Sequence, residues 1–166
     1  VQIRSGSGVY VLKRSGNNLA AEEDHGAGPF EILEARLLIE GEACALAAER
    51  LDAQQLARLD TLLQDMEQEN LQQTVTERAD EEFHCLIAEA AGNSAIATTV
   101  RWLWKLRNES EISTHFHQRV RQEGSRPIIE DHRKIVAALK KRNPAAARRA
   151  MRKHLQRVID SLLEQR

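Results

Sequence analysis

The segment Ile128-Ile-Glu-Asp-His-Arg-Lys-Ile-Val-Ala-Ala-Leu139 carries apolar residues at helical spacing. Ile135 and Val136 are adjacent, and Leu139 follows them four and three residues later, so one face of a helix holds all three. His132 falls in register with them, on the face that should be buried. The segment therefore predicts an amphipathic helix that carries an imidazole ring toward the protein interior.

The same helical period continues on both sides of this segment, from Pro29 to the end of the chain. Pro29 suits the first turn of a helix, Asp52 is typical of a helix cap, and Gly92-Asn93 is typical of a helix end. Asn143-Pro144 combines a cap with a first-turn proline, while residues 115–125 show no clear period. We expect an all-α fold, an antiparallel bundle of six or seven helices.

Composition and charge agree with a helical globule and exclude several other classes of protein. Aromatic residues make up only 4% of the 166 residues, whereas hydrophobic residues make up 42%. The 24 Lys and Arg residues are balanced by 25 Asp and Glu residues, which argues against nucleic-acid binding as the whole function. No apolar run approaches a membrane span, and two cysteines cannot form a disulfide framework. We expect a cytoplasmic protein without membrane contact.

The N-terminal stretch differs from the rest of the chain. Two short runs of alternating apolar and polar residues flank Ser5-Gly-Ser-Gly8, which predicts a short β-hairpin within residues 1–13. Residues 14–28 are rich in Gly, Asn and acidic residues, as in a linker. The helical domain then covers residues 29–166. A lone hairpin is marginally stable in water, so it should belong to a larger unit.

Four polar residues fall on helical faces that should be buried. Asp80 and His84 are one turn apart, and His154 lies in register with Met151 and Leu162, as His132 does on its own helix. Three histidines and one carboxylate from three helices thus face one core. They either satisfy one another through hydrogen bonds or share a divalent metal ion, and the pattern alone leaves both interpretations open.

Two arginines also follow buried stripes. Arg36 has Glu40 one turn further along, and Arg107 continues a face that includes Leu103 and Trp104. One interpretation is a surface ion pair whose aliphatic stem covers the core. The other is a pair of guanidinium groups facing a cavity, where they would suit a carboxylate or a polyhydroxy acid.

These motifs resemble the FadR C-terminal (FCD) domain of GntR-family bacterial transcription regulators. The resemblance covers residues 29–166 and rests on four segments: Glu34-Ala-Arg36-Leu-Leu-Ile-Glu40, Asp80-Glu-Glu-Phe-His84, Glu130-Asp-His132 and Ala145-Ala-Ala through His154-Leu155. The first eleven residues look like the wing of the winged helix-turn-helix domain that precedes an FCD domain in such regulators. The opening Gly28-Pro-Phe-Glu31 and the motif Trp104-x-x-Arg107 are most similar to the hexuronate-utilisation regulators.

The resemblance implies an effector-binding and dimerisation domain that acts as a homodimer. Asp80, His84, His132 and His154 would hold a divalent metal, zinc first, with nickel, manganese or iron as alternatives. A small carboxylic or sugar acid would complete its coordination, and Arg36 and Arg107 would bind the acid. Operator DNA would bind through an N-terminal domain of which this chain carries only the wing, with Arg4, Gly6 and Gly8 as its DNA-contacting residues.

The sequence therefore predicts the sensing part of a ligand-responsive transcription regulator rather than an enzyme. The alternative is a metal-dependent hydrolase or another metalloenzyme that uses an Asp/His₃ site, since such a site leaves coordination positions open. A hydrolase would also need a general base, and Glu81 and Glu82 point away from the face of Asp80 and His84.

Overall fold

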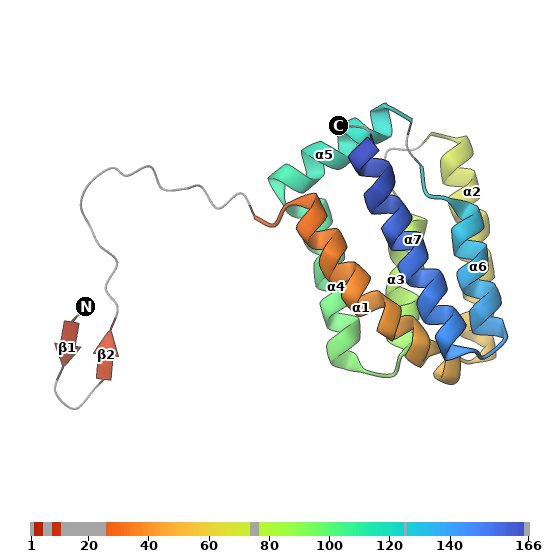
Figure 1. Ribbon diagram of the computed structural model, residues 1–166, viewed down its shortest axis with the longest axis horizontal. Helices are drawn as coiled ribbons and strands as arrows, with labels where there is room; N and C mark the ends of the chain where they lie inside the picture. Colours follow the sequence, from red (N-terminus) through yellow and green to blue (C-terminus); the bar gives the residue numbers. More distant parts are fainter. Residues whose placement is uncertain (1, 5–7, 11–25, 74–76, 125, 165–166) are drawn as a thin grey trace.

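The computed structural model describes residues 2–4, 8–10, 26–73, 77–124 and 126–164. Seven α-helices lie within these ranges (Figure 1), in agreement with the six or seven that the sequence predicts. They are α1 (Pro29–Arg50), α2 (Ala53–Leu71), α3 (Arg78–Ala90), α4 (Ser94–Glu109), α5 (Glu111–Gln122), α6 (Ile129–Lys140) and α7 (Pro144–Glu164). The prediction of an all-α bundle is confirmed. Residues 115–125, whose structure the sequence leaves undecided, lie largely in α5.

The N-terminal hairpin is also present. Strand β1 (Gln2–Arg4) pairs antiparallel with β2 (Gly8–Tyr10), and Ile3 lies opposite Val9. Gly6 and most of the expected linker lie outside the described residues. No helix in the described ranges is both long and apolar enough to cross a membrane.

Local sequence signals explain where several helices begin. The Asp52 carboxylate accepts a hydrogen bond from Gln55 N at 2.7 Å, and Gln55 Oε1 accepts one from Asp52 N at 2.9 Å, a reciprocal cap on α2. Asn93 caps α4 through Ala95 N and Ile96 N, and Asn143 caps α7 through Ala146 N. These caps satisfy backbone N–H groups that a helix leaves free at its start.

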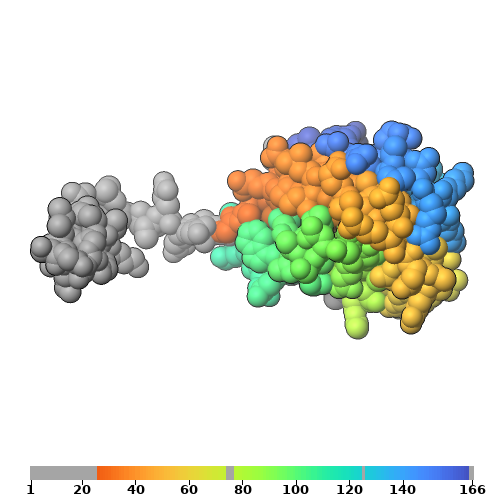
Figure 2. Space-filling model, turned by 90° about the horizontal axis from the view of Figure 1, so that it is seen from below, coloured from red at the N-terminus to blue at the C-terminus, as the bar shows by residue number. Residues whose placement is uncertain are grey.

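The bundle is organised around the pairing of α1 with α7, the most extensive helix contact in the fold. Gly41 allows these helices to approach closely, because a Cβ atom there would lie 2.7 Å from Cγ of Arg152. On the face seen in Figure 2, α1 in orange lies between α4 in green and the blue helices α6 and α7.

Two apolar clusters lie along the α1–α7 pair, with polar residues between them. We call the larger one the main core; it is built from α1, α2, α3, α6 and α7 and includes Leu59, Met66, Phe83, Leu139 and Met151. The smaller terminal cluster holds Leu33, Val120 and Leu162. Between them lies a set of buried polar residues that we call the polar layer: Arg36, Glu40, Asp80, His84, His132 and His154.

Candidate metal centre and effector pocket

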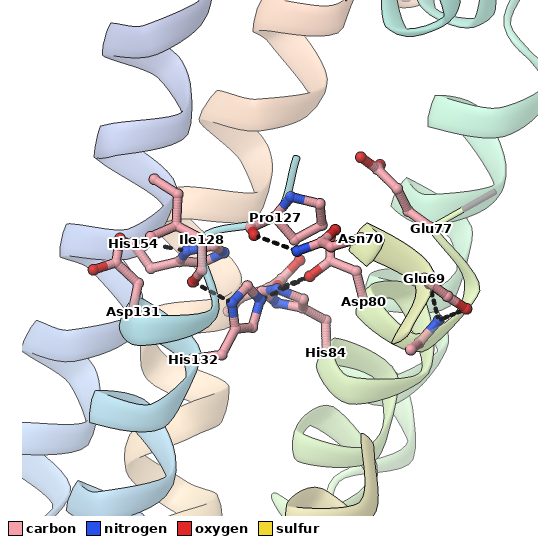
Figure 3. Close-up of polar contacts among 12 residues, drawn as sticks. Glu69, Asn70, Glu77, Asp80, His84, Pro127, Ile128, Asp131, His132 and His154 are labelled. Atoms are coloured by element: carbon pink, nitrogen blue, oxygen red, sulfur yellow. Dashed lines mark hydrogen bonds and ion pairs between the residues drawn. The ribbon is translucent and has the colours of Figure 1, made fainter. Parts of the chain in front are cut away.

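The four residues singled out by the sequence meet inside the bundle. Asp80 and His84 lie on α3, His132 on α6 and His154 on α7. All four are buried, and one potential ligand atom from each lies within 4.8 Å of those from the others. Figure 3 shows the four side chains converging from three helices.

Each histidine turns its Nδ1 atom away from the cluster toward an oxygen atom. His84 Nδ1 bonds Glu40 Oε2, His132 Nδ1 donates to the carbonyl oxygen of Ile128 at 2.9 Å, and His154 Nδ1 lies 3.9 Å from Asp131 Oδ2. Outer hydrogen bonds fix the ring orientation and the tautomer of a metal-binding histidine, as at His84 and His132. His154 Nδ1 only faces the Asp131 carboxylate, because 3.9 Å is too long for a hydrogen bond. The arrangement leaves Nε2 of every ring for the cluster.

Asp80 is the shared acceptor of this cluster. Its Oδ1 atom lies 2.7 Å from His132 Nε2 and 3.6 Å from His84 Nε2. Burial disfavours the charged carboxylate, but the hydrogen bond from His132 and the nearby His84 ring hold the pKa of Asp80 well below its usual range. Asp80 is therefore ionised at neutral pH.

The donor set suits a divalent ion. Among the described residues, the buried His84 Nε2 has no hydrogen-bond partner within bonding distance. Three imidazole nitrogens and one carboxylate are ligands that zinc, nickel, manganese and iron accept. An ion at this position would satisfy the His84 nitrogen and neutralise the Asp80 carboxylate. The four residues therefore fit a metal site, while His132 and Asp80 also bond each other directly without one.

The electrostatic environment differs between the His84 and His154 rings. Burial raises the pKa of Glu40, but the nearby Arg36 and His84 outweigh it and lower that pKa to about 2. Burial lowers the pKa of His84, but the carboxylates of Glu40 and Asp80 prevail and raise it. Burial and the neighbouring His132 ring lower the pKa of His154 to about 4. His154 is thus neutral at pH 7, as a metal ligand must be.

The two arginines singled out by the sequence lie beside this cluster. Arg36 is buried and donates from Nε to Glu40 Oε1 at 2.7 Å, while Arg107 bonds Glu77. Both guanidinium groups stack on the buried ring of Trp104, at 4.1 and 5.0 Å from its centroid. Both also line a cavity of about 70 Å³ that reaches Asp80 and His154. Neither is a simple surface ion pair.

Sequence reasoning missed several residues of this region. Glu40 was expected only as a partner of Arg36, yet it also orients His84 from 44 residues away. Asp131 faces His154 and accepts from Arg157 at 2.7 Å. Glu77 and Arg121, which bond each other, carry no local pattern because they belong to different elements. The one available signal was the buried stripe shared by Arg36 and Glu40.

The residues that an enzyme would need are engaged elsewhere. Glu81 accepts from Asn108 Nδ2 at 2.9 Å, and Glu82 accepts from Arg58 Nη2 at 2.6 Å.

The remaining residues singled out by the sequence lie apart from the cluster. His117 lies at the cavity wall, while the neighbouring His115 is exposed. Arg4 and Gly8 occupy the two strands of the hairpin, opposite each other.

Comparisons with known proteins bear on the same region. The FCD domain model matches residues 31–157. This chain belongs to the FCD domain family. It is 35% identical to the Uxu operon transcriptional regulator of Escherichia coli K12 over 99% of this chain and 66% of that protein. It is 34% identical to the Uxu operon regulator of Haemophilus influenzae over 99% of this chain and 62% of that protein.

A solved structure agrees with the family assignment. The GntR protein of Streptococcus agalactiae superposes with a TM-score of 0.60 at 25% identity, over 95% of this chain and 72% of that one. By sequence, this chain covers less than two thirds of the length of either Uxu regulator. The resemblance to GntR-type regulators is confirmed, and these relatives are named as regulators rather than enzymes.

Proposed function

We propose that this FCD chain is the effector-binding and dimerisation portion of a ligand-responsive bacterial transcription regulator. Residues 29–166 form the sensing domain, which acts in the cytoplasm as a homodimer. Residues 1–13 are the wing of a winged-helix domain that binds operator DNA, with Arg4, Gly6 and Gly8 at the DNA, and residues 14–28 connect the two. The family match and the regulators among the relatives support this assignment.

The proposed sensor site combines a metal centre with an arginine-lined pocket. Asp80, His84, His132 and His154 hold a divalent ion, zinc first, with nickel, manganese and iron as alternatives. The observation that carries this proposal is the common orientation of the three histidines, each with Nδ1 turned to an outer oxygen. A bound divalent ion would supply a Lewis-acidic anchor for a carboxylate.

The proposed effector is a small organic acid, and a hexuronate or a related sugar acid in particular. Arg36 and Arg107 both border the cavity beside the cluster, and guanidinium groups bind carboxylate and hydroxyl oxygens with defined geometry. Two positive groups beside the metal centre favour an anion over a neutral sugar. The resemblance to hexuronate-utilisation regulators supports the same ligand class.

The metal centre is tested by elemental analysis of protein purified without an affinity tag. We expect about one divalent ion per chain in the unmodified protein and a strong loss of metal in His132→Ala and His154→Ala. The matched control is His115→Ala, which removes an exposed histidine outside the cluster. Undiminished metal in both cluster variants would overturn the four-ligand site.

The effector class is tested by a thermal-shift screen of small carboxylic acids, hexuronates included, with and without added metal. A ligand that binds only the native state raises stability by about 2.7 kcal/mol at a hundred times its Kd. We expect stabilisation by an acid only when the metal is present. Equal stabilisation of the metal-free protein would separate the acid from the metal centre and contradict the proposed site.

A further inference from the structure

One carboxylate bridges two arginines at the entrance of the effector pocket. Glu77, which immediately precedes α3, bonds Arg107 of α4 through Oε2 and Arg121 of α5 through Oε1. The three side chains are nearly buried, with 11%, 12% and 8% of their surface exposed, respectively. Because each carboxylate oxygen takes a different guanidinium group, the Glu77 bridge ties the start of α3 to two other helices.

The Glu77 bridge lies where two hollows of the molecule meet. The inner cavity of about 70 Å³ reaches Asp80 and His154 of the metal cluster. An outer, open groove of about 520 Å³ extends from the bridge over Asn108, Thr114 and Gln118. The two hollows share four lining residues: Glu77, Arg107, His117 and Arg121. The bridge thus lies on the boundary between the hollow beside the metal cluster and the outer groove.

We propose that the Glu77 bridge is a latch that an acidic effector must displace to reach the metal cluster. A protein cavity of about 150 Å³ holds one benzene molecule, so a cavity of about 70 Å³ has too little room for a six-carbon acid. Opening the bridge joins the inner cavity to the outer groove, which gives the acid both a route and the room it needs. This latch rests on the function proposed above.

The chemistry of the latch also selects the ligand. Arg107 and Arg121 are nearly buried, and removing the carboxylate that they share without a replacement weakens the charge compensation of both guanidinium groups. An entering acid brings anionic oxygens that take the place of Glu77 on the arginines. A neutral sugar of the same size brings none. The latch therefore opens at low cost for an anion and at high cost for a neutral ligand.

Trp104 offers a way to observe the latch without any ligand. The chain contains two tryptophans, of which Trp102 is 55% exposed and Trp104 is fully buried against Arg36 and Arg107. In a Trp102→Phe background, all tryptophan fluorescence comes from Trp104. We expect Glu77→Gln to raise acrylamide quenching of Trp104 about twofold or more, as a closed segment that opens locally should.

Two further variants keep this measurement interpretable. Glu81→Gln is the matched control, because Glu81 lines the same outer groove but accepts only from Asn108 among the bonds seen there. It should leave Trp104 quenching unchanged. Glu77→Asp retains the charge but shortens the side chain by one methylene, so it should reach one arginine and give an intermediate value. Glu77→Asp also serves if Glu77→Gln folds poorly.

Ligand binding is measured separately by calorimetry, with D-glucuronate and D-galacturonate as probes and metal-loaded protein. If the latch is closed about nine tenths of the time, removing it tightens the apparent Kd roughly tenfold. We expect this gain in Glu77→Gln and none in Glu81→Gln.

The two readouts separate the latch from the proposed function. Unchanged Trp104 quenching in both Glu77 variants overturns the latch, even if the unmodified protein binds the acids. Increased quenching with no binding of either acid to any variant leaves the latch standing and overturns the proposed effector class. Increased quenching together with tighter binding supports both.

Discussion

The main core and the polar layer lie next to each other in one bundle but are held together by different forces. In the main core, side chains such as Leu139 and Met151 are fully buried and remove apolar surface from water. In the polar layer, Arg36, Glu40 and His84 are equally buried, yet they depend on each other for compensation. Volume matters in the first region, and charge balance in the second.

Under the proposed function, this difference would let one small domain be both stable and responsive. The main core consists of apolar side chains that bury one another, so its packing requires no ligand. The polar layer contains a nitrogen, His84 Nε2, that no group in the described ranges satisfies, beside a charged Asp80. A bound ion or acid therefore changes the energy of the polar layer far more than that of the main core.

The largest expected effect comes from a nearly isosteric change in the polar layer. Glu40→Gln leaves no cavity but removes the carboxylate that Arg36 and His84 share. Breaking a buried pair by removing one partner costs about 3–5 kcal/mol. We expect a loss of that size in the free energy of unfolding of the metal-free protein, measured by urea denaturation.

The control for this prediction removes both charges. Arg36→Met combined with Glu40→Gln no longer leaves a buried guanidinium group without its carboxylate. The amide oxygen can still accept from His84 Nδ1. The double variant should recover more than half of the stability lost by the single variant. If it is instead less stable than Glu40→Gln, packing rather than charge balance controls this region.

The main core should respond to volume instead. Leu139→Ala removes a fully buried side chain from α6 and should lower the free energy of unfolding by about 2–5 kcal/mol. Metal content of the folded fraction should not change, because Leu139 belongs to the main core and lies two turns beyond His132 on α6. Loss of metal at the same time as loss of stability would show that the two regions are coupled.

The two regions also differed in how far the sequence revealed them. The stripes of Ile135, Val136 and Leu139 predicted a buried face, and the same stripes placed His132 inside it. Helix α5 remained undecided because two of its three buried residues, Ser113 and Arg121, are polar and hide the period. Apolar periodicity is local to each helix, so a single sequence carries it in full.

Polar partners were harder to predict for a physical reason. His84 bonds a residue 44 positions away, and Arg121 bonds Glu77 at the same separation. Which carboxylate meets which cation depends on how helices pack, and no spacing along the chain encodes that. The sequence therefore indicated the four cluster residues and the Arg36–Glu40 pair. It did not indicate that Glu40 orients His84, or that Glu77 and Asp131 take part.

A smaller effect is expected from the outer partner of His154. Asp131→Asn keeps the shape of the side chain but removes the charge that faces His154 Nδ1. Loss of such an outer partner usually weakens metal binding by about 10–100-fold. We expect a loss in that range for zinc, measured by competition with a chromogenic chelator. Asp60→Asn, which frees Lys140 at the surface, is the matched control and should bind zinc normally.

The smallest effect at neutral pH is expected for His117, at the wall between the cavity and the outer groove. Burial, with the positive charges of Arg107 and Arg36, lowers its pKa to about 3 in the folded protein. The unfolded value is about 6.5, so between pH 6.5 and pH 3 the unfolded chain binds a proton that the folded protein does not. His117 therefore adds no pH dependence above pH 7 and lowers stability progressively as the pH falls through this window.

His117→Gln removes that contribution and should make the protein less sensitive to acid. Between pH 7 and pH 5, the variant should lose less unfolding free energy than the unmodified protein, by at most about 1.4 kcal/mol per pH unit. His115→Gln alters an exposed histidine on the same helix and should retain the original slope. Parallel stability curves for His117→Gln and the unmodified protein would mean that His117 takes up a proton equally in both states. In that case the arginines at the cavity wall are screened from His117. Charge balance would then control only the four cluster residues and Glu40, and not the cavity wall.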